Sequence, residues 1–216
     1  VTVFAAASLT AAFTEIAELA PSLDVTLNFD GSPTLVDQIT SGAPADVLAT
    51  ADEASMERAT EAAIVAPDPT IFATNSGVLI VPKGNPAQVS GVDASLDGTK
   101  LVVCAPAVPC GATAHKIAEA AGVTLKPVSE EQRVTDVRGK VSSGEADAGI
   151  VFATDAQAAG DAVETIAVDP EKRFAARYPI TIVTEAKNPA AARAFIDLVL
   201  SEEGQAVLAT HGFGAP

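Results

Sequence analysis

Hydrophobic positions along the chain follow two alternating spacings. Short runs of consecutive or alternating apolar residues, such as 1–6 and 25–29, are typical of strands. Between these runs, apolar residues recur every three or four positions, first over residues 9–19, as on the buried face of an amphipathic helix. This alternation predicts an α/β fold with a largely parallel sheet.

The same pattern continues to the end of the chain and predicts most of its elements. The predicted strands are 1–6, 25–29, 46–49, 78–81, 101–103, 149–152, 165–168 and 180–183. The predicted helices begin near residues 9, 35 and 52, and then lie over 113–121, 137–143, 189–200 and 202–210.

Two apolar extended segments, Ser76–Pro82 and Tyr178–Thr184, are flanked by polar, loop-like sequence. If both segments connect two lobes, the first domain is discontinuous and contains 1–79 plus 184–216, and the second contains 80–183. Patterning alone leaves a single sheet domain equally open.

Composition limits the classes of partner. The 216 residues, 48% of them apolar, are enough for one large domain or two small ones. The net charge of −15 argues against nucleic acid, because neutralising phosphates requires clustered Lys and Arg. No apolar run approaches the ~20 residues that span a bilayer. Because the chain begins at Val1, we expect a mature form from which a targeting segment has been removed.

The two cysteines, Cys104 and Cys110, allow two interpretations. Their spacing permits a small disulfide loop, which is typical of an oxidising compartment, but two unrelated buried thiols would give the same sequence. Together with His115 and His211 they do not have the spacing of a zinc site, so we predict no direct metal ligands.

Four predicted strand-to-helix turns are candidates for binding an anion. A helix start offers unpaired N–H groups and a partial positive charge, so several helix starts together can hold an anion without Lys or Arg. The candidate groups are the hydroxyls of Ser8 and Ser32, the amides of Thr34 or Leu35, those of Cys110 and Gly111, and that of Val137.

Each of these turns also has a simpler interpretation. Ser8 and Ser32 are good N-cap residues, Pro33 fits the first helical position, and Thr135 or Asp136 can cap a helix before Val137. The turn at Cys110 can be a tight turn closed by the disulfide. Arg138 can clamp a ligand or pair with a nearby carboxylate.

Five segments in order along the chain resemble the periplasmic molybdate-binding proteins of ABC importers. They are Thr2–Leu9, Gly42–Val47, Asp136–Arg138, Gly144–Val151, and the C-terminal pattern from Phe195 through Gly204–Ala206 to Phe213. The resemblance implies a type II periplasmic-binding-protein fold with two α/β lobes. Each lobe would be a mostly parallel sheet flanked by helices, and two crossing strands would join them.

The resemblance also implies a set of ligand-binding residues. The oxyanion would accept hydrogen bonds from the hydroxyls of Ser8 and Ser32 and from the N–H groups of Cys110 and Val137. A tyrosine that donates in well-known members follows a Gly-Ile-Val strand, and Phe152 occupies this position here. A ligand oxygen that receives no hydrogen bond would reduce the binding free energy by about 1–3 kcal/mol, which lowers the affinity about tenfold to hundredfold.

The expected function is therefore high-affinity binding of molybdate or tungstate and delivery to the membrane permease of an ABC importer. We expect a monomer without a cofactor, in the periplasm or another extracytoplasmic space. Tethering to the membrane through a missing N-terminal segment remains open.

Three alternatives remain open. The ligand can be sulfate, or phosphate if Asp30, two residues before Ser32, accepts the phosphate proton. A serine hydrolase would need Ser8 or Ser32 as nucleophile and His115 or His211 as base, but no Gly-x-Ser-x-Gly elbow is present. A sensor or interaction module could use the same residues.

Overall fold

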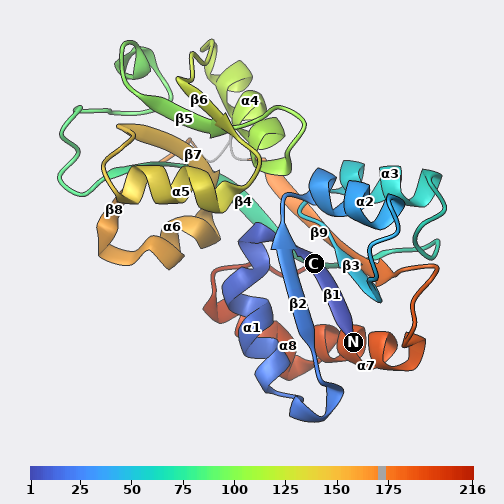
Figure 1. The fold of residues 1–216 in the computed structure, drawn as a ribbon. Helices are drawn as coiled ribbons and strands as arrows, with labels where there is room; N and C mark the ends of the chain where they lie inside the picture. Colours follow the sequence, from blue (N-terminus) through green and yellow to red (C-terminus); the bar gives the residue numbers. More distant parts are fainter. Residues whose placement is uncertain (170–173) are drawn as a thin grey trace. The chain divides into compact units, whose positions relative to one another are not determined.

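Two strands divide the chain into two units in the computed structural model, which describes residues 1–169 and 174–216. The first unit comprises Val1–Thr74 and Arg177–Pro216, and the second comprises Asn75–Ala176. The chain therefore enters the second unit within strand β4 (Thr70–Pro82) and returns within strand β9 (Ala175–Ile182) (Figure 1).

These two strands contain most of the two segments predicted to cross between lobes. Both boundaries between the units lie a few residues earlier in the chain than the predicted ones, which were 79/80 and 183/184. The predicted second domain also includes residues 170–173, which lie outside the described residues.

The first unit alternates strands and helices, as the sequence predicts. Its elements besides parts of β4 and β9 are β1 (Thr2–Ala6), η1 (Ala7–Leu9), α1 (Thr10–Glu18), η2 (Pro21–Leu23), β2 (Thr26–Asp30), α2 (Ser32–Thr40), β3 (Val47–Ala49), α3 (Glu53–Glu61), α7 (Pro189–Leu200) and α8 (Glu202–Thr210). The strand order is β2-β1-β3-β9, in which β1 is parallel to β2 and β3, and β9 is antiparallel to β3.

Helices cover both faces of this sheet (Figure 1). Phe4 of β1 and Leu48 of β3, which are paired in register, belong to one core cluster with Leu35 and Val36 of α2 and Met56 of α3. Helices α1, α7 and α8 pack together on the other face. Burial on both faces explains why β1 and β3 read as nearly continuous apolar runs.

An aromatic cluster fills the core beside α1 and α7. The Phe13 ring lies 5.6 Å from both Phe72 and Phe195, and the Tyr178 ring lies 6.2 Å from Phe72 and 5.4 Å from Phe213, centroid to centroid. Large buried rings in tilted or edge contact contribute both apolar area and a defined geometry. The cluster therefore fixes β9 against α1, α7 and the C-terminal segment.

Asp46 is a buried carboxylate that joins three parts of the first unit at the start of β3. It is 3% exposed and accepts hydrogen bonds from the backbone N–H of Thr2 at 2.8 Å and of Asn188 at 2.9 Å. Burial by itself would raise the pKa of Asp46, but these two donors, together with the Asn188 side chain and the Lys187 backbone, outweigh burial and hold the pKa below its ordinary value. The charge is thus stabilised by backbone donors.

The second unit also alternates strands and helices, and its sheet contains antiparallel as well as parallel strand pairs. Its elements besides parts of β4 and β9 are η3 (Ala94–Leu96), β5 (Leu101–Cys104), α4 (Pro109–Ala121), β6 (Ser129–Glu131), α5 (Val134–Ser142), β7 (Ala148–Phe152), α6 (Ala153–Ala159), η4 (Gly160–Ala162) and β8 (Val163–Ile166). The strand order is β4-β7-β5-β6, and β8 pairs with β4. Strand β5 is parallel to β6 and β7, whereas β4 is antiparallel to β7.

Close packing of α5 on β7 depends on a glycine. A Cβ added at Gly149 would lie 2.9 Å from side-chain carbons of both Val137 and Val141. Real Cβ atoms do not approach so closely, so a larger residue here would push α5 away from the sheet. Gly149 therefore allows α5, including Val137 in its first turns, to pack closely on β7.

The structure differs from the predicted elements where hydrophobic patterning is weak. Strand β6, Ser-Glu-Glu, carries no apolar residue and was not predicted, and neither was the alanine-rich α6. Helices α4 and α5 begin at Pro109 and Val134, earlier than predicted. Across the described residues, no helix combines the length and the hydropathy needed to cross a membrane.

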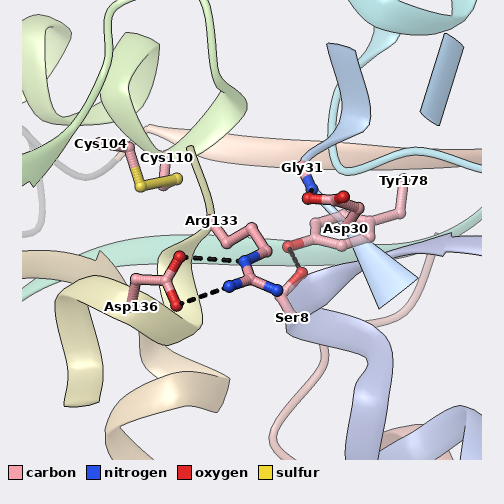
Figure 2. Close-up of a disulfide and its surroundings, with 8 residues drawn as sticks. All are labelled: Ser8, Asp30, Gly31, Cys104, Cys110, Arg133, Asp136 and Tyr178. Atoms are coloured by element: carbon pink, nitrogen blue, oxygen red, sulfur yellow. Dashed lines mark hydrogen bonds and ion pairs between the residues drawn. A yellow bond between two sulfur atoms is a disulfide. The ribbon is translucent and has the colours of Figure 1, made fainter. Parts of the chain in front are cut away.

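The predicted disulfide between Cys104 and Cys110 is present. The Cα atoms lie 5.6 Å apart, and the bridge joins the last residue of β5 to the second residue of α4 (Figure 2). The turn is tight, because a Cβ added at Gly111 would lie 2.0 Å from the Ala105 carbonyl oxygen. The disulfide therefore anchors the start of α4 to the end of the strand.

We expect the variant Cys104→Ser/Cys110→Ser to lose about 2 kcal/mol of unfolding free energy, because the cross-link restricts the unfolded chain. Urea unfolding monitored by circular dichroism measures the loss. A reducing agent should lower the midpoint of the unaltered protein and leave that of the double variant unchanged. Equal midpoints with and without reductant in the unaltered protein would contradict a stabilising role.

Candidate functional site

The two predicted serines lie at one edge of the first unit's sheet. Strands β1 and β2 are parallel neighbours, with Ala6 opposite Asp30, and Ser8 and Ser32 each follow two residues later. Ligands of α/β proteins bind outside the carboxyl ends of parallel strands. The structure therefore places both hydroxyls at the edge where a ligand is expected.

The Ser8 hydroxyl does not cap a helix. Ser8 lies within η1, and α1 begins at Thr10 after the N-cap residue Leu9, so the prediction that Ser8 is an N-cap is wrong. Its Oγ instead lies 3.0 Å from the hydroxyl oxygen of Tyr178, with which it forms a hydrogen bond (Figure 2). Sequence analysis did not identify Tyr178 as a functional residue.

The Ser32 hydroxyl is also directed away from its own helix. Ser32 is the first residue of α2, the N-cap is Gly31, and Pro33 is therefore the second residue rather than the first. The Ser32 Oγ accepts a hydrogen bond from the N–H of Ala51 at 3.0 Å, and Ser32 is 1% exposed. This bond uses a lone pair of the oxygen and does not use the hydroxyl hydrogen.

The amides of Thr34 and Leu35, the two candidate backbone donors beside Ser32, differ in whether the helix already uses them. The Leu35 N–H donates to the Gly31 carbonyl at 3.0 Å, so the helix uses this amide itself. The Thr34 amide precedes that bond in the first turn, where N–H groups have no partner within the helix. Of the two amides considered, Thr34 is thus the better donor to a ligand.

The second unit places its predicted site residues at the carboxyl ends of its own parallel strands. Cys110 is the second residue of α4 after β5, Val137 is the fourth residue of α5 after β6, and Phe152 is the last residue of β7. All three are at least 97% buried, with exposures of 3%, 0% and 1%. The disulfide holds Cys110 in place through its side chain, so only its backbone amide is offered as a donor.

The helix starts predicted to bind an anion share the lack of a side-chain cap. The N-cap residues of α2, α4 and α5 are Gly31, Val108 and Arg133, and none forms a side-chain cap hydrogen bond. Helices α1, α6 and α7 also lack a side-chain cap, whereas Asp52 caps α3 and Ser201 caps α8. The uncapped amides keep their capacity to donate to an external acceptor.

The predicted cap of α5 by Thr135 or Asp136 is wrong, because the helix begins one turn earlier than expected. The Asp136 carboxylate instead accepts two hydrogen bonds from the Arg133 guanidinium, at 2.9 and 3.1 Å (Figure 2). This pair is largely exposed and contributes little to stability.

Arg138 forms an ion pair, as the simpler interpretation predicted. Its guanidinium lies 3.8 Å from Oδ1 of Asp155, whose side chain is 2% exposed. The other oxygen, Oδ2, has no hydrogen-bond partner among the described residues. Burial raises the pKa of Asp155 to about 7, although the Arg138 charge and the N–H of Phe152 partly oppose this shift.

Asp30 has a local role in the structure. Its Oδ1 accepts a hydrogen bond from the N–H of Gly31 at 2.8 Å (Figure 2). Its Oδ2 lies 3.5 Å from the Gln38 side-chain amide nitrogen. The carboxylate thus supports the turn between β2 and α2 just before Ser32.

Three of the four groups considered for a serine hydrolase, Ser8, Ser32 and His211, have other partners in the structure. The partners of Ser8 and Ser32 are Tyr178 and the Ala51 amide, and His211 Nε2 lies 2.8 Å from Glu15. Within the parts of the chain that the structure describes, no group of three or more His, Cys, Asp and Glu residues is arranged to hold a metal ion.

The protein consists of two α/β units connected by two strands. Hydroxyls and uncapped helix starts lie at the strand ends of these units, and this combination is typical of a protein that binds a small solute. The chain belongs to the bacterial extracellular solute-binding protein family, whose sequence profile matches residues 1–214. This confirms the family and the extracytoplasmic location that the sequence predicted, and a binding protein rather than an enzyme.

The similar proteins include molybdate-binding proteins. The chain is 41% identical to the molybdate-binding protein ModA of Mycobacterium tuberculosis over 221 residues, covering 100% of this chain and 85% of that protein. It is 34% identical to ModA of Escherichia coli over 230 residues, covering 99% and 88%.

The fold agrees with these relatives. The structure of the periplasmic molybdate-binding protein of Azotobacter vinelandii matches with a TM-score of 0.87 at 20% identity, covering 100% of this chain and 99% of that one. The predicted periplasmic-binding-protein fold is thereby confirmed.

We expect the variant Asp155→Asn to remove a pH dependence of stability. A pKa raised from 3.8 to about 7 means that the folded state binds the proton more tightly than the unfolded state. The free energy of unfolding therefore falls as the pH rises through this interval, by up to about 4 kcal/mol for the unaltered protein relative to the variant. Urea unfolding of both proteins at pH 5 and pH 8 measures the difference, and a difference independent of pH would contradict the assignment.

Proposed function

We propose that this protein binds molybdate or tungstate outside the cytoplasm and delivers it to the membrane permease of an ABC importer. The observation that carries the proposal is the 41% identity to ModA of Mycobacterium tuberculosis across the whole chain. Uncharged donors at the strand ends of both units support it.

In this proposal the ligand accepts hydrogen bonds from the hydroxyls of Ser8 and Ser32 and from the amides of Cys110 and Val137. Bonds to a charged acceptor contribute about 1.5–3 kcal/mol each. Several such bonds allow micromolar or tighter binding after the cost of association is subtracted. Phe152 adds no hydroxyl, so the Thr34 amide is a candidate for a further donor.

Neutral donors favour a fully ionised ligand. Molybdate, tungstate and sulfate carry no proton near neutral pH and need only donors, whereas phosphate carries a proton that needs an acceptor. The size of the cavity around the ligand would separate molybdate from sulfate. Because the net charge of −15 repels an approaching anion, we expect added salt to leave binding intact.

Isothermal titration with molybdate, tungstate and sulfate tests the proposal. We expect tight binding of molybdate, and an affinity about tenfold to hundredfold lower in each of Ser8→Ala and Ser32→Ala, because each variant removes one hydroxyl donor. Ser41→Ala is the matched control, because Ser41 is exposed at the opposite end of α2 from Ser32. If the unaltered protein gave no response to molybdate, or if neither variant weakened binding, the proposal would be wrong.

The phosphate alternative depends on Asp30 as an acceptor. Since both Asp30 oxygens already accept from or face local donors, we expect Asp30→Asn to change molybdate and phosphate affinity to the same extent. Titration of the variant with both anions measures this. A selective loss of phosphate binding would instead favour phosphate as the ligand.

A further inference from the structure

The only tyrosine of the chain, Tyr178, is hydrogen-bonded to a proposed ligand-binding hydroxyl. Its oxygen lies 3.0 Å from Ser8 Oγ, although the two residues are 170 positions apart in the sequence. Both residues belong to the first unit. The geometry allows either hydroxyl to donate.

Packing fixes the position of the Tyr178 hydroxyl. The residue is 0% exposed, and its ring makes edge contacts with Phe72 at 88° and Phe213 at 80°. A phenol has few rotatable bonds, so a ring held in this way places its oxygen at a defined point. Ser8, by contrast, lies in a short 3-10 turn, where its hydroxyl can rotate.

The chemistry of the two hydroxyls determines the direction of the hydrogen bond once an anion is bound. A dianion has no hydrogen to give, so Ser8 must donate to it, and the Ser8 oxygen is then an acceptor for Tyr178. A phenol, with a pKa of about 10, is a better donor than an aliphatic hydroxyl. Hydrogen bonds in such a chain polarise one another, so Tyr178 strengthens the bond from Ser8 to the anion.

The same strand also supports Ser32. The carbonyl of Pro179, next to Tyr178 in β9, accepts from the N–H of Thr50 at 3.1 Å. The following residue, Ala51, donates to Ser32 Oγ at 3.0 Å. In β9, Tyr178 is thus the partner of Ser8, and the adjacent Pro179 binds the residue that precedes the partner of Ser32.

We propose that Tyr178 is a positioning residue for oxyanion binding, which donates to Ser8 Oγ and thereby directs the Ser8 hydroxyl hydrogen toward the ligand. This inference rests on the proposed function, because it needs an anionic ligand at Ser8. Tyr178 is fully buried, and in this inference it acts through Ser8, with which it shares the hydrogen bond, and not by touching the ligand.

A double-mutant cycle with molybdate tests the inference. Tyr178→Phe keeps the ring and removes only the hydroxyl, and we expect it to weaken molybdate binding about five- to tenfold in isothermal titration. In the Ser8→Ala background the same change should have no further effect, within about twofold. Phe195→Leu is the control for lost core packing, because Phe195 contacts Phe13 and belongs to the same aromatic cluster.

Tyrosine fluorescence gives a second readout, because the chain has no tryptophan and the emission comes from Tyr178 alone. Saturating molybdate should change this emission in the unaltered protein. The change should be absent in Ser8→Ala at saturation, since the hydrogen-bond chain is interrupted. Loss of thermal stability without loss of affinity in Tyr178→Phe would indicate a structural role only.

The possible failures are distinguishable. If the unaltered protein binds molybdate and Ser8→Ala weakens binding, but Tyr178→Phe binds as the unaltered protein does, the inference is wrong and the proposed function stands. If the effects of the two variants simply multiply in the double variant, Tyr178 does not act through Ser8 and the inference is also wrong. If the unaltered protein does not bind molybdate, both fail.

Discussion

Backbone N–H groups in the first turn of a helix have no partner within that helix, and this protein leaves several of them without a side-chain cap. A cap at such a position typically stabilises a helix by about 1 kcal/mol, so its omission is a cost to folding. The cost recurs at α1, α2, α4, α5, α6 and α7, whereas α3 and α8 are capped. At α2, α4 and α5, which carry residues of the proposed site, the first-turn amides can donate to an acceptor from outside the helix.

Two buried carboxylates, Asp46 and Asp155, show how hydrogen-bond donors affect a buried charge. Asp46 is stabilised because backbone donors from Thr2 and Asn188 reach it. Asp155 is buried, Arg138 lies 3.8 Å from one of its oxygens, and the other oxygen has no hydrogen-bond partner among the described residues, so burial dominates and raises the pKa of Asp155 to about 7. At Asp46 the hydrogen-bond donors together outweigh burial, whereas at Asp155 burial outweighs both the Arg138 charge and the Phe152 N–H. A dianion bound by hydroxyls and amides would depend on the same balance.

Much of the fold could be predicted because hydrophobic spacing reports burial directly. Helices α7 and α8 were predicted residue for residue, and β1 and β3 to within one residue. The roles of Ser8 and Ser32 could not be predicted in the same way. A shift of one or two residues in a helix start decides whether a serine caps it, and the contact between Ser8 and Tyr178 joins residues with no local relation in sequence. Strand β6 pairs through its backbone alone, which leaves no pattern of side chains to detect.

The discontinuity of the first unit has a consequence for biosynthesis. Strand β9 and helices α7 and α8 follow the second unit in the sequence and are therefore synthesised after it, yet Phe13 of α1 packs against Phe195 of α7. The apolar face of α1 must therefore stay uncovered, or be covered by something else, until the second unit and α7 have been made. Such a delay keeps the first unit from completing its fold before the second unit has been made.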